Sequence, residues 1–205
     1  MRALEAELLS GEALYREVVL HRLAEARESV WISTANVKAM LVPSGGGAFR
    51  PVVELFSTLA GRGVELRLLH AELPSRPFRA AFDASSLVKR GLALKICPRV
   101  HFKCVLVDGA WLYLGSANLT GAGLGAKHAN KRNFELGFVT EDFDTIDRVS
   151  ALYQSVWRGE PCAACRVRDA CPDPIGPALL GGRGRGRDRG ATGIELGRPR
   201  RLGRG

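Results

Sequence analysis

One short stretch of the sequence, HFKCVLVDGAWLYLGSANLT at residues 101–120, contains side chains suited to chemistry on a phosphate ester. Its first apolar run, residues 102–107, is typical of a strand, in which alternate side chains face the same side. His101 and Lys103 are two residues apart, so we expect them to share a side of that strand. An ammonium neutralises phosphate oxygens, and an imidazole can act as a nucleophile or carry a proton.

The second apolar run, WLYLG, follows directly after Asp108 and Gly109, a dipeptide that favours a hairpin turn. We therefore expect Asp108 to be a structural or supporting carboxylate more than a group that touches the substrate. Beyond that run, the hydroxyl of Ser116 and the carboxamide of Asn118 can approach the same sheet edge as Lys103. Lys103 and Asn118 would then bind the non-bridging oxygens of a phosphate.

These residues form the pattern HxKx4Dx6GSxN, which resembles the motif of the phospholipase D superfamily. The positions that match are His101, Lys103, Asp108, Gly115, Ser116 and Asn118. Farther along, Asn133 and Glu135 are similar to the Asn-x-Glu strand of that family. The resemblance covers roughly residues 12–158, and the single-motif bacterial nuclease branch is the closest in size.

The resemblance implies a two-step displacement at phosphorus without a metal, through a phosphohistidine intermediate. It implies catalytic roles for His101, Lys103, Asp108, Ser116, Asn118 and Glu135. We expect substrate binding by Lys103, Asn118 and Asn133, and by the loop cations Lys131 and Arg132. Each active site of the family uses two histidines from two copies of the motif, whereas this chain has one copy. The other histidines, His21, His70 and His128, are not followed by a lysine two residues on. We therefore expect a homodimer with the site on its two-fold axis.

The role of Glu135 can be reasoned from its chemistry. It would accept a proton from one ring nitrogen of His101, fixing the tautomer and raising the basicity of the ring. The Ser116 hydroxyl would donate either to the phosphate or to Glu135. The alternative is a degenerate copy of the motif, in which Glu135 is only a solvated strand residue.

Strand and helix patterns alternate along the chain, followed by a hairpin, and this predicts an α/β fold with a mixed β-sheet flanked by helices. The expected helices are 12–28, 49–60, 78–88 and 142–157, and the expected strands are 30–34, 64–70, 92–96, 102–107, 111–115 and 134–139. The sequence PSGGG at 43–47 is a candidate loop and boundary. The predicted architecture is the α/β/α sandwich of the phospholipase D family.

Composition divides the chain into three parts. Residues 1–158 would form the catalytic domain, 159–176 a cysteine-rich segment, and 177–205 a disordered tail rich in arginine and glycine. The net charge is +9, and residues 181–205 carry eight arginines against two acidic residues, so +6 of it lies in the tail. Such a tail is either a solvated extension or an arm for nucleic acid.

The cysteine-rich segment has the spacing Cys162-x2-Cys165-x5-Cys171, which suits a structural zinc or iron–sulfur site. The spacing is similar to the last three ligands of the iron–sulfur loop of some DNA glycosylases, but Ser155 stands where that loop has its first cysteine. Asp173, His128 or a group of a second subunit could be the fourth ligand. The alternative is unligated thiols, and we expect Cys97 and Cys104 to be core residues.

For catalysis we expect no cofactor. Arg90, Lys95 and Arg99 precede the motif, and Lys127, Lys131 and Arg132 follow it in the loop 121–133. These cations favour a nuclease over a phospholipase D-type enzyme that hydrolyses phospholipids, and over a non-catalytic module that binds nucleic acid. An odd number of cysteines, the acidic residues near the N-terminus and the lack of a long apolar run predict a cytoplasmic protein without a transmembrane segment.

Overall fold

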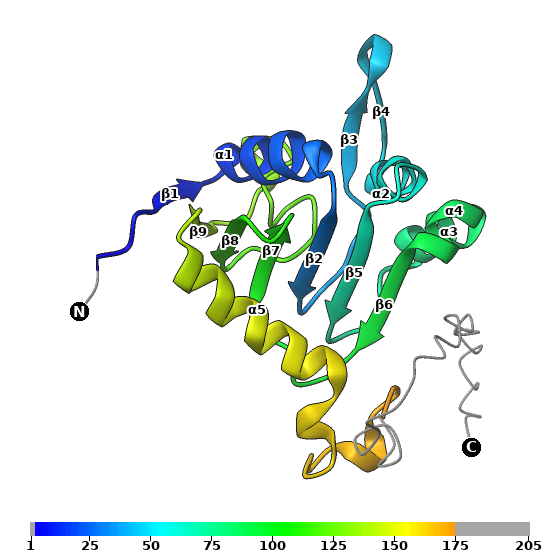
Figure 1. Ribbon diagram of the computed structural model, residues 1–205. Helices are drawn as coiled ribbons and strands as arrows, with labels where there is room; N and C mark the ends of the chain where they lie inside the picture. Colours follow the sequence, from blue (N-terminus) through cyan, green and yellow to red (C-terminus); the bar gives the residue numbers. More distant parts are fainter. Residues whose placement is uncertain (1–2, 175–205) are drawn as a thin grey trace.

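A seven-stranded mixed sheet organises the computed structural model, which describes residues 3–174 (Figure 1). In sheet order its strands are β1 (Glu7–Ser10), β9 (Leu136–Thr140), β8 (Trp111–Gly115), β7 (Lys103–Val107), β2 (Ser29–Thr34), β5 (Glu65–His70) and β6 (Leu92–Ile96). Strands β2, β5 and β6 are parallel, and the other pairs are antiparallel. The predicted mixed sheet is confirmed, whereas the predicted tail lies outside the described residues.

Helices cover both faces of the sheet. One face carries α1 (Glu12–Leu14) with its continuation η1 (Tyr15–Leu23), α2 (Val52–Gly61), α3 (Arg76–Ala84) and α4 (Ser86–Gly91). The larger core lies there and includes Leu14, Phe56 and Phe78. The opposite face carries α5 (Phe143–Arg158), drawn in yellow in Figure 1. The fold is therefore the three-layer α/β/α arrangement that the alternating pattern predicts.

Helix α5 shows why its sequence is helical. Ile146 and Tyr153 are seven residues apart and both face the sheet, and the ring of Tyr153 stacks on Trp31 of β2 at 5.5 Å between centroids. The Asp142 carboxylate accepts a hydrogen bond from the backbone N–H of Thr145 at 2.9 Å, which caps the first turn. Gly159, with φ of 75°, ends the helix.

The segment around PSGGG differs from the prediction. Residues 43–47 lie at the tip of a hairpin of β3 (Leu41–Ser44) and β4 (Ala48–Pro51), joined through η2 (Gly45–Gly47), and not at a domain boundary. Because β4 runs to Pro51, helix α2 starts at Val52 instead of residue 49.

Two further elements differ from the sequence interpretation. The expected helix over 78–88 is split into α3 and α4 at Ser85, whose extended backbone breaks the first helix and whose hydroxyl caps the second. Strand β1 was not predicted, and it pairs antiparallel with β9 at the edge of the sheet.

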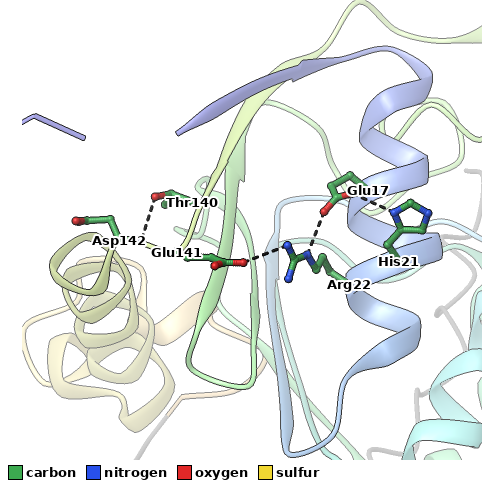
Figure 2. Close-up of polar contacts among 6 residues, drawn as sticks. All are labelled: Glu17, His21, Arg22, Thr140, Glu141 and Asp142. Atoms are coloured by element: carbon green, nitrogen blue, oxygen red, sulfur yellow. Dashed lines mark hydrogen bonds and ion pairs between the residues drawn. The ribbon is translucent and has the colours of Figure 1, made fainter. Parts of the chain in front are cut away.

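A set of ion pairs fastens η1 to the end of β9 (Figure 2). The Arg22 guanidinium lies 3.0 Å from Glu17 on its own helix and 3.1 Å from Glu141, which follows β9. Glu17 also contacts His21 at 3.1 Å, so this exposed histidine belongs to a surface ion pair.

No helix in residues 3–174 has both the length and the apolar character that crossing a membrane requires. The cytoplasmic location stays a prediction.

Candidate active site at the ends of strands β7, β8 and β9

Most residues of the motif gather at one end of three neighbouring strands. Lys103, Gly115 and Gly137 are paired across β7, β8 and β9. His101 lies two residues before Lys103, Ser116 follows Gly115 directly, and Glu135 lies two residues before Gly137, so all three flank this row. The hairpin and β9 therefore bring together groups that are up to 34 positions apart in the sequence.

Lys103 and His101 are in direct contact. The Lys103 Nζ donates to the backbone oxygen of His101 at 2.5 Å and lies 3.4 Å from His101 Nδ1. The lysine is buried, whereas the imidazole is exposed. Burial lowers the pKa of Lys103, and the nearby Glu135 carboxylate acts in the opposite direction. The sheet thus holds the ammonium in place and presents the imidazole to solvent.

Glu135 is held by two other groups of the motif. The Ser116 hydroxyl donates to Glu135 Oε2, and the Asn133 amide nitrogen donates to Glu135 Oε1 at 3.1 Å. Among the hydrogen bonds of residues 3–174, none joins His101 to Glu135, so the expected proton acceptance from the ring is not seen. The Glu135 carboxylate instead links Ser116, after β8, to Asn133, before β9. The Ser116 hydroxyl also accepts a hydrogen bond from the backbone N–H of Leu136 at 3.2 Å.

The side-chain oxygen of Asn118 is used to hold the backbone after β2. Its Oδ1 accepts from the backbone N–H groups of Ala35 and Asn36 at 3.1 and 3.2 Å and lies 3.1 Å from the Thr34 hydroxyl. These three residues come at and after the end of β2, and the sequence analysis missed them. The Asn118 amide nitrogen has no hydrogen-bond partner within the described part of the chain, so it is the half that can donate to a phosphate oxygen.

Asp108 is not brought together with the other motif residues. It lies beyond Val107, at the opposite end of β7 from Lys103, in a turn where it has φ of 53° and Gly109 has φ of 63°. Its carboxylate accepts from the backbone N–H groups of residues 27, 28 and 29 at 2.8–3.2 Å. The position of Asp108 therefore does not support the catalytic role that the family resemblance implies, and it fits the structural role that the hairpin turn signal favours.

We expect Asp108→Ala to lower the free energy of unfolding by about 1–3 kcal/mol, because three backbone donors at the start of β2 lose their acceptor. Burial alone would raise the pKa of Asp108, but the N–H groups of Ser29, Glu28 and Arg27 together outweigh it and lower the pKa. The carboxylate's contribution is therefore present above pH ~4 and lost as pH falls through the lowered pKa. Urea unfolding of both proteins at pH 7 and pH 3 would measure this, and an equal difference at the two pH values would contradict it.

The cations expected at the mouth of the site divide into two groups. Lys127 and Lys131 are exposed in the loop that precedes β9, while the Arg132 guanidinium forms an ion pair with Glu12 at 2.8 Å. Lys95 and Arg99 do not face this site: Lys95 Nζ donates to the Trp157 carbonyl at 2.5 Å, and Arg99 contacts Cys165 Sγ at 3.6 Å. They line a separate cavity after α5.

The remaining histidines do not supply a second imidazole of the same kind. His70 is buried at the end of β5, where its Nδ1 lies 2.8 Å from the Glu72 carbonyl oxygen, and burial lowers its pKa. His21 is in the ion pair of Figure 2, and His128 is exposed next to η3 (Ala129–Lys131). Among the four histidines, all within residues 3–174, His101 is the one that contacts a buried lysine.

The cysteine segment follows α5 and contains η4 (Glu160–Cys162) and η5 (Arg168–Ala170). Cys162, Cys165 and Cys171 are half-buried and free of disulfides. Within residues 3–174, no three cysteine, histidine, aspartate or glutamate side chains are arranged closely enough to bind one metal ion together. Cys104 is buried in the core, as expected, but Cys97 is only half-buried and lines the same cavity as the three segment cysteines. Cys97 packs against the edge of the core that contains Cys104 and is not fully inside it, so the prediction of a core residue holds for Cys97 only in part.

Comparisons with known proteins agree with this architecture. A family model described as "Cardiolipin synthase, PLD-like domain" matches residues 19–157. The phospholipase D family member Nuc from Salmonella typhimurium is similar in structure, with a TM-score of 0.53 and 19% identity, over 75% of this chain and 95% of that one. NucT from Helicobacter pylori is similar over the same shares, with a TM-score of 0.52 and 16% identity. A polyphosphate kinase from Porphyromonas gingivalis is similar over 73% of this chain and 25% of its own, with a TM-score of 0.50 and 13% identity. No curated protein sequence matches.

Proposed function

The chain belongs to the phospholipase D superfamily, and from this premise we propose that it is a homodimeric, metal-independent nuclease that cleaves phosphodiester bonds through a phosphohistidine intermediate. The observation that carries the proposal is the cluster at the ends of β7, β8 and β9, where an exposed imidazole lies beside a buried ammonium. A phosphodiesterase of this kind needs both groups, since one attacks phosphorus and the other stabilises the charge that develops on its oxygens.

The reaction would have two steps. In the first, a nitrogen of His101 attacks phosphorus and forms an N–P bond, while the P–O bond to the leaving alcohol breaks. His101 of the partner subunit donates its proton to that alcohol. In the second, the partner's His101 takes a proton from water, the water oxygen attacks phosphorus, and the N–P bond breaks. Lys103 and the amide nitrogen of Asn118 would hold the non-bridging oxygens throughout.

Exposed apolar side chains beside the cluster support a second subunit. Phe134 next to Glu135 is fully exposed, and Leu8 and Leu136 are 72% and 58% exposed. The register of β1 with β9 puts these two leucines on the same sheet face. Burying them against an identical surface would stabilise a dimer and could bring two copies of His101 together.

Nucleic acid is the substrate that the surrounding charge favours. Lys127 and Lys131 are exposed on the loop that leads to Asn133 and Glu135, where a polyanion bound at His101 would pass. The arginine-rich tail, outside the described residues, would add contacts with the phosphate backbone.

One observation favours hydrolysis of phospholipids as a second candidate. On the β3–β4 hairpin Val42 is buried, but Leu41 is 54% exposed and Phe49, on the paired strand, is 63% exposed. Leu41, Pro43 and Phe49 share one face of the β3–β4 hairpin, which projects from the rest of the molecule (Figure 1). An exposed apolar face of this kind could insert into a lipid surface.

A substrate panel separates these candidates. The purified chain would be incubated in EDTA with single- and double-stranded DNA, RNA, and vesicles of phosphatidylcholine, with His101→Ala as the matched control. Cleavage of nucleic acid that persists in EDTA and disappears in the variant supports the proposal. Release of choline without cleavage of nucleic acid would replace it with the lipid candidate, and tight binding of nucleic acid without turnover would replace it with a non-catalytic module.

A further inference from the structure

A cavity of about 270 Å³ lies between the end of β6 and the segment after α5. Four of the five cysteines line it, namely Cys97, Cys162, Cys165 and Cys171, and Asp173 lies among them. All four are half-buried and none forms a disulfide. Cysteines from two distant parts of the chain therefore converge on one space.

The chain holds these cysteines in different ways. Cys97 directly follows β6, and its backbone N–H donates to the His70 carbonyl at 2.8 Å, so it is fixed to the end of the sheet. The other three lie in tight turns. The N–H of Cys162 bonds Gly159, that of Cys165 bonds Cys162, and that of Cys171 bonds Arg168, at 2.9–3.3 Å. These turns place all three cysteines in the wall of the cavity.

The segment lacks a core of its own. None of residues 160–174 is fully buried, and its half-buried side chains are the three cysteines with Val167, Arg168 and Asp173. Fifteen residues with so little buried apolar surface cannot offset their loss of conformational entropy. A bound metal centre is a common way to hold such a segment, since its binding free energy becomes folding free energy.

Charge around the cavity fits a centre with several thiolates. The Arg99 guanidinium contacts the Cys165 sulfur at 3.6 Å. Lys95, Arg99 and Arg168 line the cavity, so the negative charge that four thiolates leave on a metal centre has cations beside it.

We propose that Cys97, Cys162, Cys165 and Cys171 together bind a metal centre with four thiolate ligands, either zinc or an iron–sulfur cluster. Cys97 supplies the fourth ligand that the segment's own spacing lacks. Binding would release the four thiol protons to solvent and involves no change of oxidation state at sulfur. Because the side chains do not yet stand at ligand positions, the turns of the segment would close on Cys97, which the sheet holds.

The proposed centre has a consequence for the active site. Pro98, Val100 and Phe102 line the same cavity, and they belong to the stretch that carries His101. A filled centre would fix this stretch at Cys97, while the pairing of β7 with β2 and β8 fixes its other end at Lys103. Metal binding at Cys97 and the position of His101 are therefore linked through the three residues 98–100.

The test uses the full chain, purified without chelator and in the absence of oxygen. Zinc, iron and acid-labile sulfide are measured per chain together with the visible absorption spectrum. Zinc alone, at about one per chain, identifies a zinc site, whereas about four irons with equal sulfide and absorption near ~400 nm identify a cluster. Cys97→Ser and Cys162→Ser should each lower the metal content at least about fivefold. Cys104→Ser is the matched control, because Cys104 lies in the core outside the cavity, and it should keep the wild-type content.

Alkylation of the wild-type chain gives a measurement that needs no variant to fold. With the centre in place, the four cavity cysteines should resist alkylation, and removal of the metal should make these four reactive together. Less than about 0.3 metal per folded chain, or disulfides among the four, would overturn the proposal. Full metal content in Cys97→Ser, with loss in Cys162→Ser, would overturn the four-thiolate centre in favour of a site made by the segment alone.

Discussion

His101→Ala is expected to lower the rate of phosphodiester cleavage by about 10⁴-fold or more, because the variant loses the atom that attacks phosphorus. The imidazole is exposed and its described side-chain contact is the one with Lys103, so its removal should leave the fold intact. Initial rates on the best nucleic acid of the substrate panel would measure the loss. Circular dichroism and thermal unfolding would establish that the variant is folded.

The matched control is His21→Ala, which removes another exposed histidine. His21 lies on η1 in the ion pair with Glu17 and is not part of the cluster, so cleavage should stay within about twofold of wild type. Cleavage by His101→Ala at the wild-type rate would show that the site has been assigned to the wrong residue.

Mixing subunits tests the shared site separately from the role of the residue. If each site needs His101 from both subunits, a mixed dimer with one His101→Ala chain is inactive. An equimolar mixture that has exchanged subunits should then retain about one quarter of the wild-type activity, whereas independent monomers would retain about one half. A value of one half, or an active species that sediments as a monomer, would contradict the homodimer.

The alternating patterns of the chain predicted most of the sheet because its central strands are bounded by clear turn signals. Asp108-Gly109, for example, is the turn between β7 and β8, and the register of that hairpin follows from it. Strand β1 escaped notice because it lies at the edge, where three of its four side chains are exposed and the apolar alternation disappears. The β3–β4 hairpin was missed for a similar reason, since its exposed apolar residues resemble the start of the following helix.

The candidate site was predictable where the function depends on spacing along one hairpin, as for His101 and Lys103. It was not predictable where distant segments meet. Nothing near Cys97 in the sequence indicates that the cysteines 65–74 positions later share its cavity. The contact of Asn118 with the residues after β2 likewise depends on the order of strands in the sheet, which local patterns do not determine.

Gly115 illustrates how tightly that order constrains the site. A Cβ at this position would lie 2.5 Å from the Tyr113 hydroxyl and 2.7 Å from both the Gly137 Cα and the Leu136 carbonyl oxygen. Two of these three atoms belong to the backbone of the neighbouring segment and cannot rotate away. Glycine at this position therefore permits the close approach of β8 to β9.

We therefore expect Gly115→Ala to lower the free energy of unfolding by about 3 kcal/mol and the melting temperature by about 10 °C, because β8 and β9 must move apart. Gly121→Ala is the control: a Cβ there meets side-chain atoms no closer than 3.7 Å, so its effect should stay within about 1 kcal/mol. Thermal and urea unfolding would measure both, and equal stability of the two variants would contradict the packing argument.

The cleavage rate of Gly115→Ala would be measured at a temperature where the variant is still folded. A reduced rate would indicate that the site is displaced, and a wild-type rate would indicate a packing defect alone. Ser116 follows Gly115 and bonds both Glu135 and Leu136, so separation of the strands should also break this link between β8 and β9. Adding Tyr113→Phe relieves the contact with the hydroxyl but not the two with backbone, and it should restore only part of the stability. Full recovery in the double variant would mean that the tyrosine, and not the approach of the two strands, requires glycine at this position.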